Sequence, residues 1–310
     1  MTEPAAPPSG KVAVVTGAAG GMGRVLVTEL ARRGHTVVAV IRTPADGERL
    51  RAEVAARIGV DRLDARAADL ADLAAVHELA AGVRSRHPEL HLLVNNAGAL
   101  LRRRAVTAQG VEMHVAVDHL AAFALTDLLL EPLRAGAPAR VVNVVSATIA
   151  DTRRFPVRRR PRPVLLDPFE VADLRRMNPD VRFAPFQAYA RAKLLTVMCG
   201  YLLAERLRGT GVTVNAVHPG VVATRIAADA LPAVLAPLAG ALRRFLLTPE
   251  QGAAAVLRVA TAPELDGVTG RYFVRDAEAR SPEVSYDRDI QEWLWAASAA
   301  VTGRARGLTP

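Results

Sequence analysis

A short apolar run followed by a glycine-rich turn constrains the fold of this chain more than any other feature. Residues 12–15 (VAVV) form an uninterrupted apolar run typical of a buried strand. Residues 16–23 (TGAAGGMG) follow, and a helix-forming stretch comes next. Glycines let a backbone approach a diphosphate, and a helix N-terminus offers N–H groups and the positive end of its dipole. We therefore predict a phosphate-binding turn. The glycine spacing, Gly17-x3-Gly21-x-Gly23, differs from the commonest dinucleotide pattern, and a plain tight turn is the alternative.

Strand-like and helix-like segments alternate along the rest of the chain. The later predicted strands are 36–41, 62–68, 92–94, 140–145, 212–217 and 271–274. The predicted helices are 24–33, 46–58, 72–86, 111–133, 187–208, 249–260 and 286–302. Thr248 and Gln251 are placed to form a capping box before the helix that starts at Pro249. The alternation predicts an α/β fold: a Rossmann-type, doubly wound parallel sheet of about seven strands flanked by helices, in a single domain over 11–310. Ligands of such sheets bind at the C-terminal ends of the strands.

Composition limits the class of protein and its partners. With 310 residues, 51% hydrophobic and 23% charged, the chain is typical of a soluble globular protein. Its single cysteine, Cys199, excludes an intramolecular disulfide and a multi-cysteine zinc site. A net charge of +9 could indicate nucleic acid or an anionic surface. The basic clusters lack the pattern of stacking aromatic residues that single-strand binders need, so we attribute the charge to the Arg-rich composition and expect no nucleic-acid partner.

Neither the N-terminal residues nor the uncharged run near the C-terminal third is predicted to insert into a membrane. Residues 1–10 are Pro-rich and polar, which predicts a flexible tail without the apolar core of a signal peptide. The uncharged run 230–242 contains Pro232 and Pro237 and is too short to span a bilayer. We therefore expect no stable membrane insertion and a cytoplasmic location.

Tyr189 and Lys193 are the strongest candidates for chemistry. They lie four residues apart in a predicted helix and so share one face of it. A nearby ammonium stabilises a phenolate and lowers the pKa of the phenol from its reference value of roughly 10. The chain has 40 Lys and Arg residues but only two lysines, Lys11 and Lys193, so this lysine is unlikely to be incidental. The alternative is a surface lysine beside a core tyrosine.

Three other side chains stand at predicted strand ends. Ser146 is either a turn residue or a second hydrogen-bond donor facing Tyr189. Arg42 stands where NAD-binding proteins usually have a carboxylate for the ribose, and it favours the 2′-phosphate of NADP(H); the alternative is one more solvated arginine in an Arg-rich chain. Asp69 could accept from the adenine amine or cap the next helix, although Asp72 is better placed as the cap.

Two irregular segments lie near these strand ends. Residues 147–186 contain several prolines, which argue against regular structure, and form either a lid or an insertion without a role. Their arginine cluster comprises Arg153, Arg154, Arg158, Arg159, Arg160 and Arg162. The cluster could meet an anionic substrate or only solvent. The apolar segment 225–247 is expected to cover the substrate.

Taken together, these motifs resemble the short-chain dehydrogenase/reductase family over nearly the whole chain after residue 10. The motifs are TGAAGGMG at 16–23, Asp69-Leu70, NNAG at 95–98, Ser146, YARAK at 189–193 and HPGVVAT at 218–224. Other features are similar to the retinol-dehydrogenase-like branch: Arg42, TAQGVE at 107–112, RVVNV at 140–144, the long insertion before Tyr189, and GRYF at 270–273. That branch is mostly NADP-dependent and acts on alcohols and carbonyls.

The resemblance implies a role for each matching residue. Tyr189 would be the general acid and base, Ser146 would hydrogen-bond the substrate oxygen, and Lys193 would hold the nicotinamide ribose and tune Tyr189. The cofactor-binding residues it implies are Gly17, Gly21, Met22, Gly23, Arg42, Asp69, Leu70, Asn96, Ala97, Gly98, Tyr189, Lys193, Pro219, Gly220, Val222 and Thr224. It implies NADP(H) as cofactor, no metal, and a homodimer or homotetramer unless the insertion blocks pairing.

One residue departs from the family pattern. Asp118 stands where the family usually has an Asn that completes a proton relay behind the Lys. A carboxylate there would raise the pKa of Lys193 and weaken its effect on Tyr189. Alternatively Asp118 substitutes for the Asn, because much of that role runs through backbone and water; we favour this interpretation and include Asp118 among the catalytic candidates.

The leading function is therefore NADP(H)-dependent interconversion of a hydroxyl and a carbonyl on an apolar small molecule. One alternative is a family member recruited to dehydration, epimerisation or cyclisation. Another is an NADP-binding protein without turnover, against which Ser146, Tyr189 and Lys193 argue.

Overall fold

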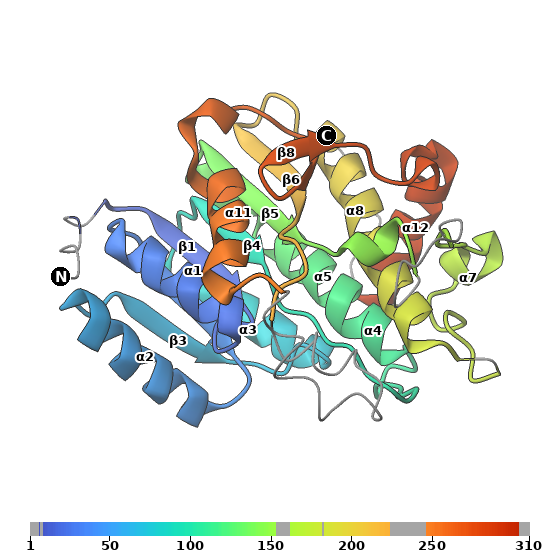
Figure 1. Ribbon diagram of the computed structural model, residues 1–310, viewed down its shortest axis with the longest axis horizontal. Helices are drawn as coiled ribbons and strands as arrows, with labels where there is room; N and C mark the ends of the chain where they lie inside the picture. The colour runs from blue at the N-terminus through green and yellow to red at the C-terminus, as the bar shows by residue number, and fades with distance from the viewer. Residues whose placement is uncertain (1–5, 7–8, 153–161, 182, 224–245, 304–310) are drawn as a thin grey trace.

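An eight-stranded sheet forms the centre of the molecule in the computed structural model (Figure 1), which describes residues 6, 9–152, 162–181, 183–223 and 246–303. The strands are β1 (Val12–Thr16), β2 (Thr36–Ile41), β3 (Leu63–Ala67), β4 (Leu92–Asn95), β5 (Ala139–Val144), β6 (Val212–His218), β7 (Tyr272–Val274) and β8 (Ala277–Ala279). Their order is β3-β2-β1-β4-β5-β6-β7-β8, and all neighbours are parallel except β7 and β8. The predicted doubly wound parallel sheet is confirmed. The short antiparallel β8 was not predicted, because the sequence AEA has little strand propensity.

Alternate residues of each strand enter different cores. In β1, Ala13 and Val15 pack on one face of the sheet, and Val14 packs on the other. Because both faces are covered, the strands are apolar throughout, which is the pattern expected of a buried parallel sheet. This explains why the strand predictions from continuous apolar runs agree closely with the structure.

Helices cover both faces of the sheet. Side chains of α1 (Gly21–Arg32), α2 (Pro44–Ile58) and α11 (Pro249–Thr261) share one core cluster. Side chains of α3 (Leu73–Arg86), α5 (Ala121–Leu128), α6 (Leu130–Ala135) and α8 (Pro185–Arg206) contribute to the other. Asp72 caps α3 by accepting from the Ala74 N–H, and Thr248 and Gln251 form the predicted capping box of α11.

The predicted continuous helix 111–133 is wrong. The chain instead forms α4 (Met113–Val115), a π-helical turn (Ala116–Leu120), α5 and α6. Pro132 has no N–H for the carbonyl of Leu128, and Arg84 donates to that carbonyl at 3.1 Å instead, so the helix breaks at Leu129. The π-helical turn contains Asp118. Its wider hydrogen-bond spacing changes the direction in which the side chains before α5 point, relative to a continuous α-helix.

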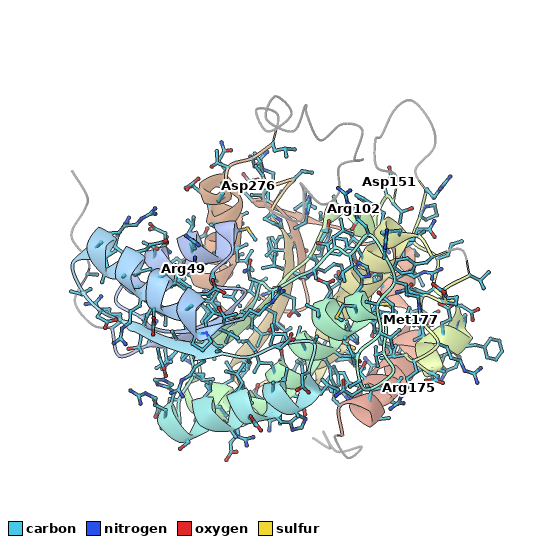
Figure 2. All side chains as sticks on the ribbon, turned by 90° about the horizontal axis from the view of Figure 1, so that it is seen from below. Arg49, Arg102, Asp151, Arg175, Met177 and Asp276 are labelled. Atoms are coloured by element: carbon cyan, nitrogen blue, oxygen red, sulfur yellow. The ribbon has the colours of Figure 1, made fainter. Side chains whose placement is uncertain are left out.

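The described part of the segment before Tyr189 is more ordered than its prolines suggested. It contains the short helix α7 (Pro168–Ala172), and its buried apolar side chains join a third core cluster. This cluster also includes residues of α8 and of the C-terminal helix α12 (Arg288–Val301). Figure 2 shows Met177 and Arg175 of this segment at the opposite end of the molecule from Arg49 on α2.

Two residues of the predicted N-terminal tail are held by backbone hydrogen bonds. The backbone N–H groups of Ala6 and Ser9 donate to Arg32 and Gly34, so these two residues of the predicted tail are attached to the loop after α1. Within the described ranges, no helix has the length and hydropathy needed to cross a bilayer.

Candidate active site

The glycine-rich turn has the close contacts expected of a phosphate-binding turn. Gly17 has φ +64°, and a Cβ there would lie 2.9 Å from the Ala97 Cα. A Cβ on Gly23 would overlap the carbonyl oxygen of Gly17. Helix α1 begins at Gly21, earlier than predicted, and no side chain in the described ranges caps it. Its first N–H groups are therefore available to an anionic group.

A hydrogen-bonded clamp joins the ends of β1 and β4. Thr16 Oγ1 accepts from the backbone N–H groups of Asn96 and Ala97, both at 3.0 Å. Asn96 Nδ2 donates to the Thr16 carbonyl at 2.8 Å. The strand order reverses between β1 and β4, which is where dinucleotides bind in open α/β sheets. The predicted cofactor residues Asn96, Ala97 and Gly98 thus lie at the switch point.

Four candidate catalytic side chains come together at the C-terminal ends of β4 and β5. Ser146 follows β5, Tyr189 and Lys193 lie on α8, and Asp118 lies on the π turn. The Ser146 hydroxyl lies near enough to the Tyr189 phenol to lower its pKa. Lys193 Nζ lies 5.8 Å from the centre of the Tyr189 ring and 3.1 Å from Asp118 Oδ1. The sequence separates these residues by up to 75 positions, and only the sheet brings them together.

The environment of Tyr189 favours the neutral phenol. Burial raises the pKa of Tyr189, the negative charge of Asp118 raises it further, and the Ser146 hydrogen bond opposes both. The sequence-based expectation that Lys193 lowers this pKa is therefore not met in this arrangement. The pKa of the Asp118 carboxyl is itself raised by burial, against the opposing charge of Lys193.

A second buried polar network, which sequence analysis did not identify, supports the site. Glu112 Oε1 accepts from His114 Nδ1 at 2.7 Å, and Glu112 Oε2 accepts from Asn178 Nδ2 at 2.9 Å. His114 Nε2 accepts from the Leu101 N–H, and Arg191 on α8 donates to Asn178 Oδ1 at 3.1 Å. The network links the chain after β4, the segment before Tyr189 and the catalytic helix. Glu112 belongs to the TAQGVE motif, but no signal in the sequence showed that His114 and Asn178 would meet it.

Replacing Glu112 with Ala is expected to destabilise the fold by about 3 kcal/mol, because three buried donors lose their acceptor. Although burial raises the pKa of Glu112, the His114 and Asn178 hydrogen bonds outweigh it and the pKa is lowered. Because the pKa of Glu112 is lowered in the folded state, its ionised form stabilises the fold above the unfolded-state pKa of roughly 4.3. The difference in unfolding free energy between the wild type and Glu112→Ala should therefore shrink as pH falls below that value.

Urea unfolding at neutral and acidic pH measures this effect. Glu283, whose ion pair with Arg280 is exposed, is the control, and its replacement by Ala should cost less than about 1 kcal/mol. Equal losses for the two variants would contradict the prediction.

Other predicted cofactor residues lie around the same sheet edge. Exposed Arg42 follows β2, next to Thr43, which caps α2. Asp69 accepts from the Ala71 N–H at 3.0 Å and does not cap α3, and half-buried Leu70 packs against the core.

The chain after β6 turns at Pro219 and Gly220, where Gly220 has φ +96°. Val222 then packs against α11 so closely that a Cβ on Gly252 would lie 2.5 Å from it. Thr224 lies outside the described residues.

Two sequence-based predictions fall largely outside the described residues. Of the arginine cluster, only Arg162 is described, and its N–H donates to Asp151 Oδ1 at 3.1 Å. The proposed substrate cover is described only at residues 246–247. Neither a substrate contact for the cluster nor the cover is tested by the structure.

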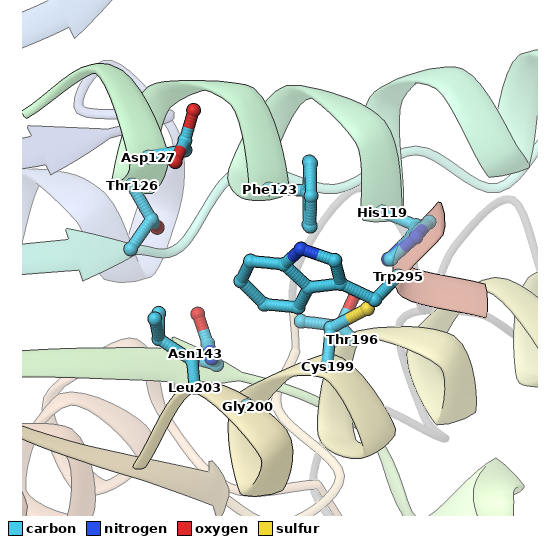
Figure 3. A pocket seen from close by; sticks show the side chains of 10 residues that line it. All are labelled: His119, Phe123, Thr126, Asp127, Asn143, Thr196, Cys199, Gly200, Leu203 and Trp295. Carbon is cyan, nitrogen blue, oxygen red and sulfur yellow. The ribbon is translucent and has the colours of Figure 1, made fainter. Parts of the chain in front are cut away.

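A small cavity between α5, α8 and α12 is separate from this site (Figure 3). It is lined by His119, Phe123, Thr126, Asp127, Asn143, Thr196, Cys199, Gly200, Leu203 and Trp295. Trp295 packs edge-on against Phe123 with ring centres 4.8 Å apart, and Arg206 lies over its ring. Because none of the four catalytic candidates lines this cavity, we assign it no part in the chemistry. No group of three or more His, Cys, Asp and Glu side chains able to hold a metal occurs in the described ranges.

Comparison with known proteins agrees with this geometry. The sequence model of the short chain dehydrogenase family matches residues 11–154. The chain is 37% identical to polyprenol dehydrogenase from Mus musculus, over 98% of this chain and 88% of that protein. It is 34% identical to retinol dehydrogenase 12 from Homo sapiens, over 95% of this chain and 87% of that protein.

Solved structures are similar over most of the chain. A crystal structure of an uncharacterised protein from Mycobacterium paratuberculosis has a TM-score of 0.70 and 28% identity, covering 97% of both chains. A protein described as an NAD(P)-dependent gluconate 5-dehydrogenase from Beutenbergia cavernae, with bound NADP, has a TM-score of 0.62 and 28% identity, covering 87% of this chain and 96% of that one. This chain is therefore an oxidoreductase of the short-chain dehydrogenase/reductase family, in its retinol-dehydrogenase-like branch.

Proposed function

We propose that this protein is an NADP(H)-dependent oxidoreductase that interconverts a hydroxyl and a carbonyl on an apolar small molecule. The observation that carries the proposal is that Ser146, Tyr189 and Lys193 come together beside the sheet's switch point. Relatives named retinol dehydrogenase and polyprenol dehydrogenase support an apolar alcohol or aldehyde as substrate. The cytoplasmic location and the homo-oligomer remain predictions.

The residues present fit a nicotinamide dinucleotide. Gly17 and Gly23 keep the turn free of side chains that would block a diphosphate, and the uncapped start of α1 offers N–H groups to it. Asn96 and Gly98 would border the adenosine side, and Pro219 to Val222 the nicotinamide side. When bound, the nicotinamide supplies or accepts the hydride.

The chain's own residues supply the proton and the geometry. The Ser146 and Tyr189 hydroxyls can both hydrogen-bond a substrate oxygen placed between them. In reduction Tyr189 donates its proton to that oxygen, and in oxidation the phenolate accepts it. The Lys193 ammonium lies 5.8 Å from the centre of the Tyr189 ring.

Two measurements test the proposal in sequence. Fluorescence titration with NADPH tests cofactor binding, and NADPH oxidation with retinal, long-chain aldehydes and short ketones tests the reaction. We expect saturable NADPH binding and faster turnover of the long apolar aldehydes. Binding without consumption of any carbonyl would instead favour a non-catalytic NADP-binding protein.

Replacing Arg42 with Asp is expected to shift cofactor preference from NADP(H) toward NAD(H). Arg42 lies two residues beyond Val40, whose carbonyl accepts from the Ala18 N–H of the glycine-rich turn. A lost Arg–phosphate contact should raise the Kd for NADPH at least about tenfold, and the new carboxylate can accept from the ribose of NADH.

Titration of both cofactors against both proteins measures the shift. Arg49, which is exposed and paired with Asp46 on α2, is the matched control, and its replacement by Ser should leave both affinities unchanged. An unchanged NADPH-to-NADH ratio in the Arg42 variant would remove Arg42 from the cofactor site.

A further inference from the structure

Three protein oxygens surround the Lys193 ammonium. An ammonium has three donors, and Lys193 Nζ has three acceptors: Asp118 Oδ1 at 3.1 Å, the Val144 carbonyl at 3.2 Å and the Ala97 carbonyl at 3.3 Å. The side chains of Lys193 and Asp118 are 5% and 0% exposed. The ammonium is thus held by an ion pair with Asp118 and by hydrogen bonds to two strand-end carbonyls.

Asp118 is bound on one oxygen only. Oδ1 accepts from Lys193 and from the Ala99 N–H at 3.0 Å, whereas the buried Oδ2 has no hydrogen-bond partner among the described residues. The Asn that the family usually has at this position would carry no charge. A buried carboxylate in direct contact with Lys193 instead cancels much of the lysine's charge as felt by the phenol.

The groups that face Asp118 and Tyr189 come from four parts of the described site. From α4, His114 faces Asp118, and its ring nitrogens are bonded to Glu112 and to the Leu101 N–H. From α8, the ionisable neighbours of Asp118 are Tyr189 and Lys193. The chains after β4 and β5 contribute the Ala99 N–H to Asp118 and the Ser146 hydroxyl to Tyr189. The adjacent His119 points away, to Ser298.

We propose that Asp118 is a positioning residue that holds the Lys193 ammonium in a buried ion pair and thereby sets the pH above which Tyr189 can accept a proton in alcohol oxidation. In carbonyl reduction the protonated phenol is the form required, so the ion pair leaves that direction intact at neutral pH. The proposal rests on the proposed function for its kinetic test only.

The kinetic test compares the pH profile of alcohol oxidation in the wild type and Asp118→Asn. The amide keeps an oxygen for the Ala99 N–H and removes the charge. The ascending limb of kcat/KM against pH should move down by about one pH unit or more, so that oxidation at a pH on that limb becomes about tenfold faster. Asp127→Asn, a buried carboxyl on α5 outside the site, should leave the limb in place. An unmoved limb in Asp118→Asn, or a loss of oxidation at every pH with the fold intact, would overturn the proposal.

A second test needs neither substrate nor a stable Asp118 variant. The chain has four tyrosines, so tyrosinate absorbance of the wild type minus that of Tyr189→Phe reports Tyr189 alone. We expect no difference up to about pH 10, the ordinary value for a tyrosine. A tyrosinate signal from Tyr189 in the wild type below about pH 9 would refute the ion-pair role, even if the protein catalyses another reaction. If Asp118→Asn folds, its difference spectrum should appear at lower pH than that of the wild type.

Discussion

Replacing Tyr189 with Phe should reduce turnover at least about a thousandfold while leaving the fold and NADPH binding nearly unchanged. The substitution removes only the hydroxyl that exchanges a proton with the substrate oxygen. The ring itself is buried, 7% exposed, and packs edge-on near His114 with ring centres 6.4 Å apart. Phe preserves that packing, so the loss should appear in kcat and not in Tm. Steady-state NADPH oxidation with a turned-over aldehyde measures it.

Tyr201 provides the matched control for this variant. Its hydroxyl is bonded to Ser281 Oγ at 2.7 Å, near the C-terminal region and away from the proposed site. Tyr201→Phe should lower stability slightly and leave kcat within about twofold of the wild type. Comparable kcat for Tyr189→Phe and the wild type would exclude Tyr189 as the proton donor, and the proposed mechanism with it.

Replacing Gly23 with Ala should abolish tight NADPH binding and destabilise the protein. The new Cβ would overlap the carbonyl oxygen of Gly17, so the turn must open where it is expected to hold the diphosphate. Forcing atoms into a packed site costs about 1–3 kcal/mol, and the displaced N–H groups at the start of α1 should raise the Kd for NADPH at least about tenfold. Thermal unfolding and fluorescence titration measure the two effects.

Gly82→Ala on α3 is the contrasting variant. A Cβ there would meet only the end of the Arg66 side chain, at 3.9 Å. Ala is favoured over Gly inside a helix, so this variant should be as stable as the wild type or more so, with NADPH affinity unchanged. If Gly23→Ala binds NADPH as tightly as Gly82→Ala, the cofactor does not contact the glycine-rich turn as proposed.

The ion pair behind Tyr189 connects these predictions to the direction of the reaction. Tyr189→Phe removes the proton donor in both directions, whereas Asp118→Asn changes only the charge around it. A site whose only lysine is neutralised by a buried carboxylate is better suited to donate a proton at neutral pH than to accept one. We therefore expect carbonyl reduction to be the faster direction for this protein at neutral pH.

The sequence by itself determined the sheet and the order of its motifs. Strands buried on both faces are continuous apolar runs, so 36–41 and 212–217 could be delimited almost to the residue. The capping box at Thr248 and the cap at Asp72 depend only on local hydrogen bonds and were equally predictable. The breaks near Leu129 and in the π turn were not, because they depend on Arg84 from another helix and on packing against α8.

The tertiary structure decided what stands next to the catalytic residues. The sequence identified Tyr189, Lys193, Ser146 and Asp118 from their spacing and their motifs, but it left open whether Asp118 substitutes for the family's Asn or weakens the effect of Lys193 on Tyr189. In the structure the buried Lys193 ammonium contacts Asp118, because the π turn and the ends of β4 and β5 place three oxygens around it. The strength and sign of an electrostatic effect depend on distance and burial, and neither can be read from residue order.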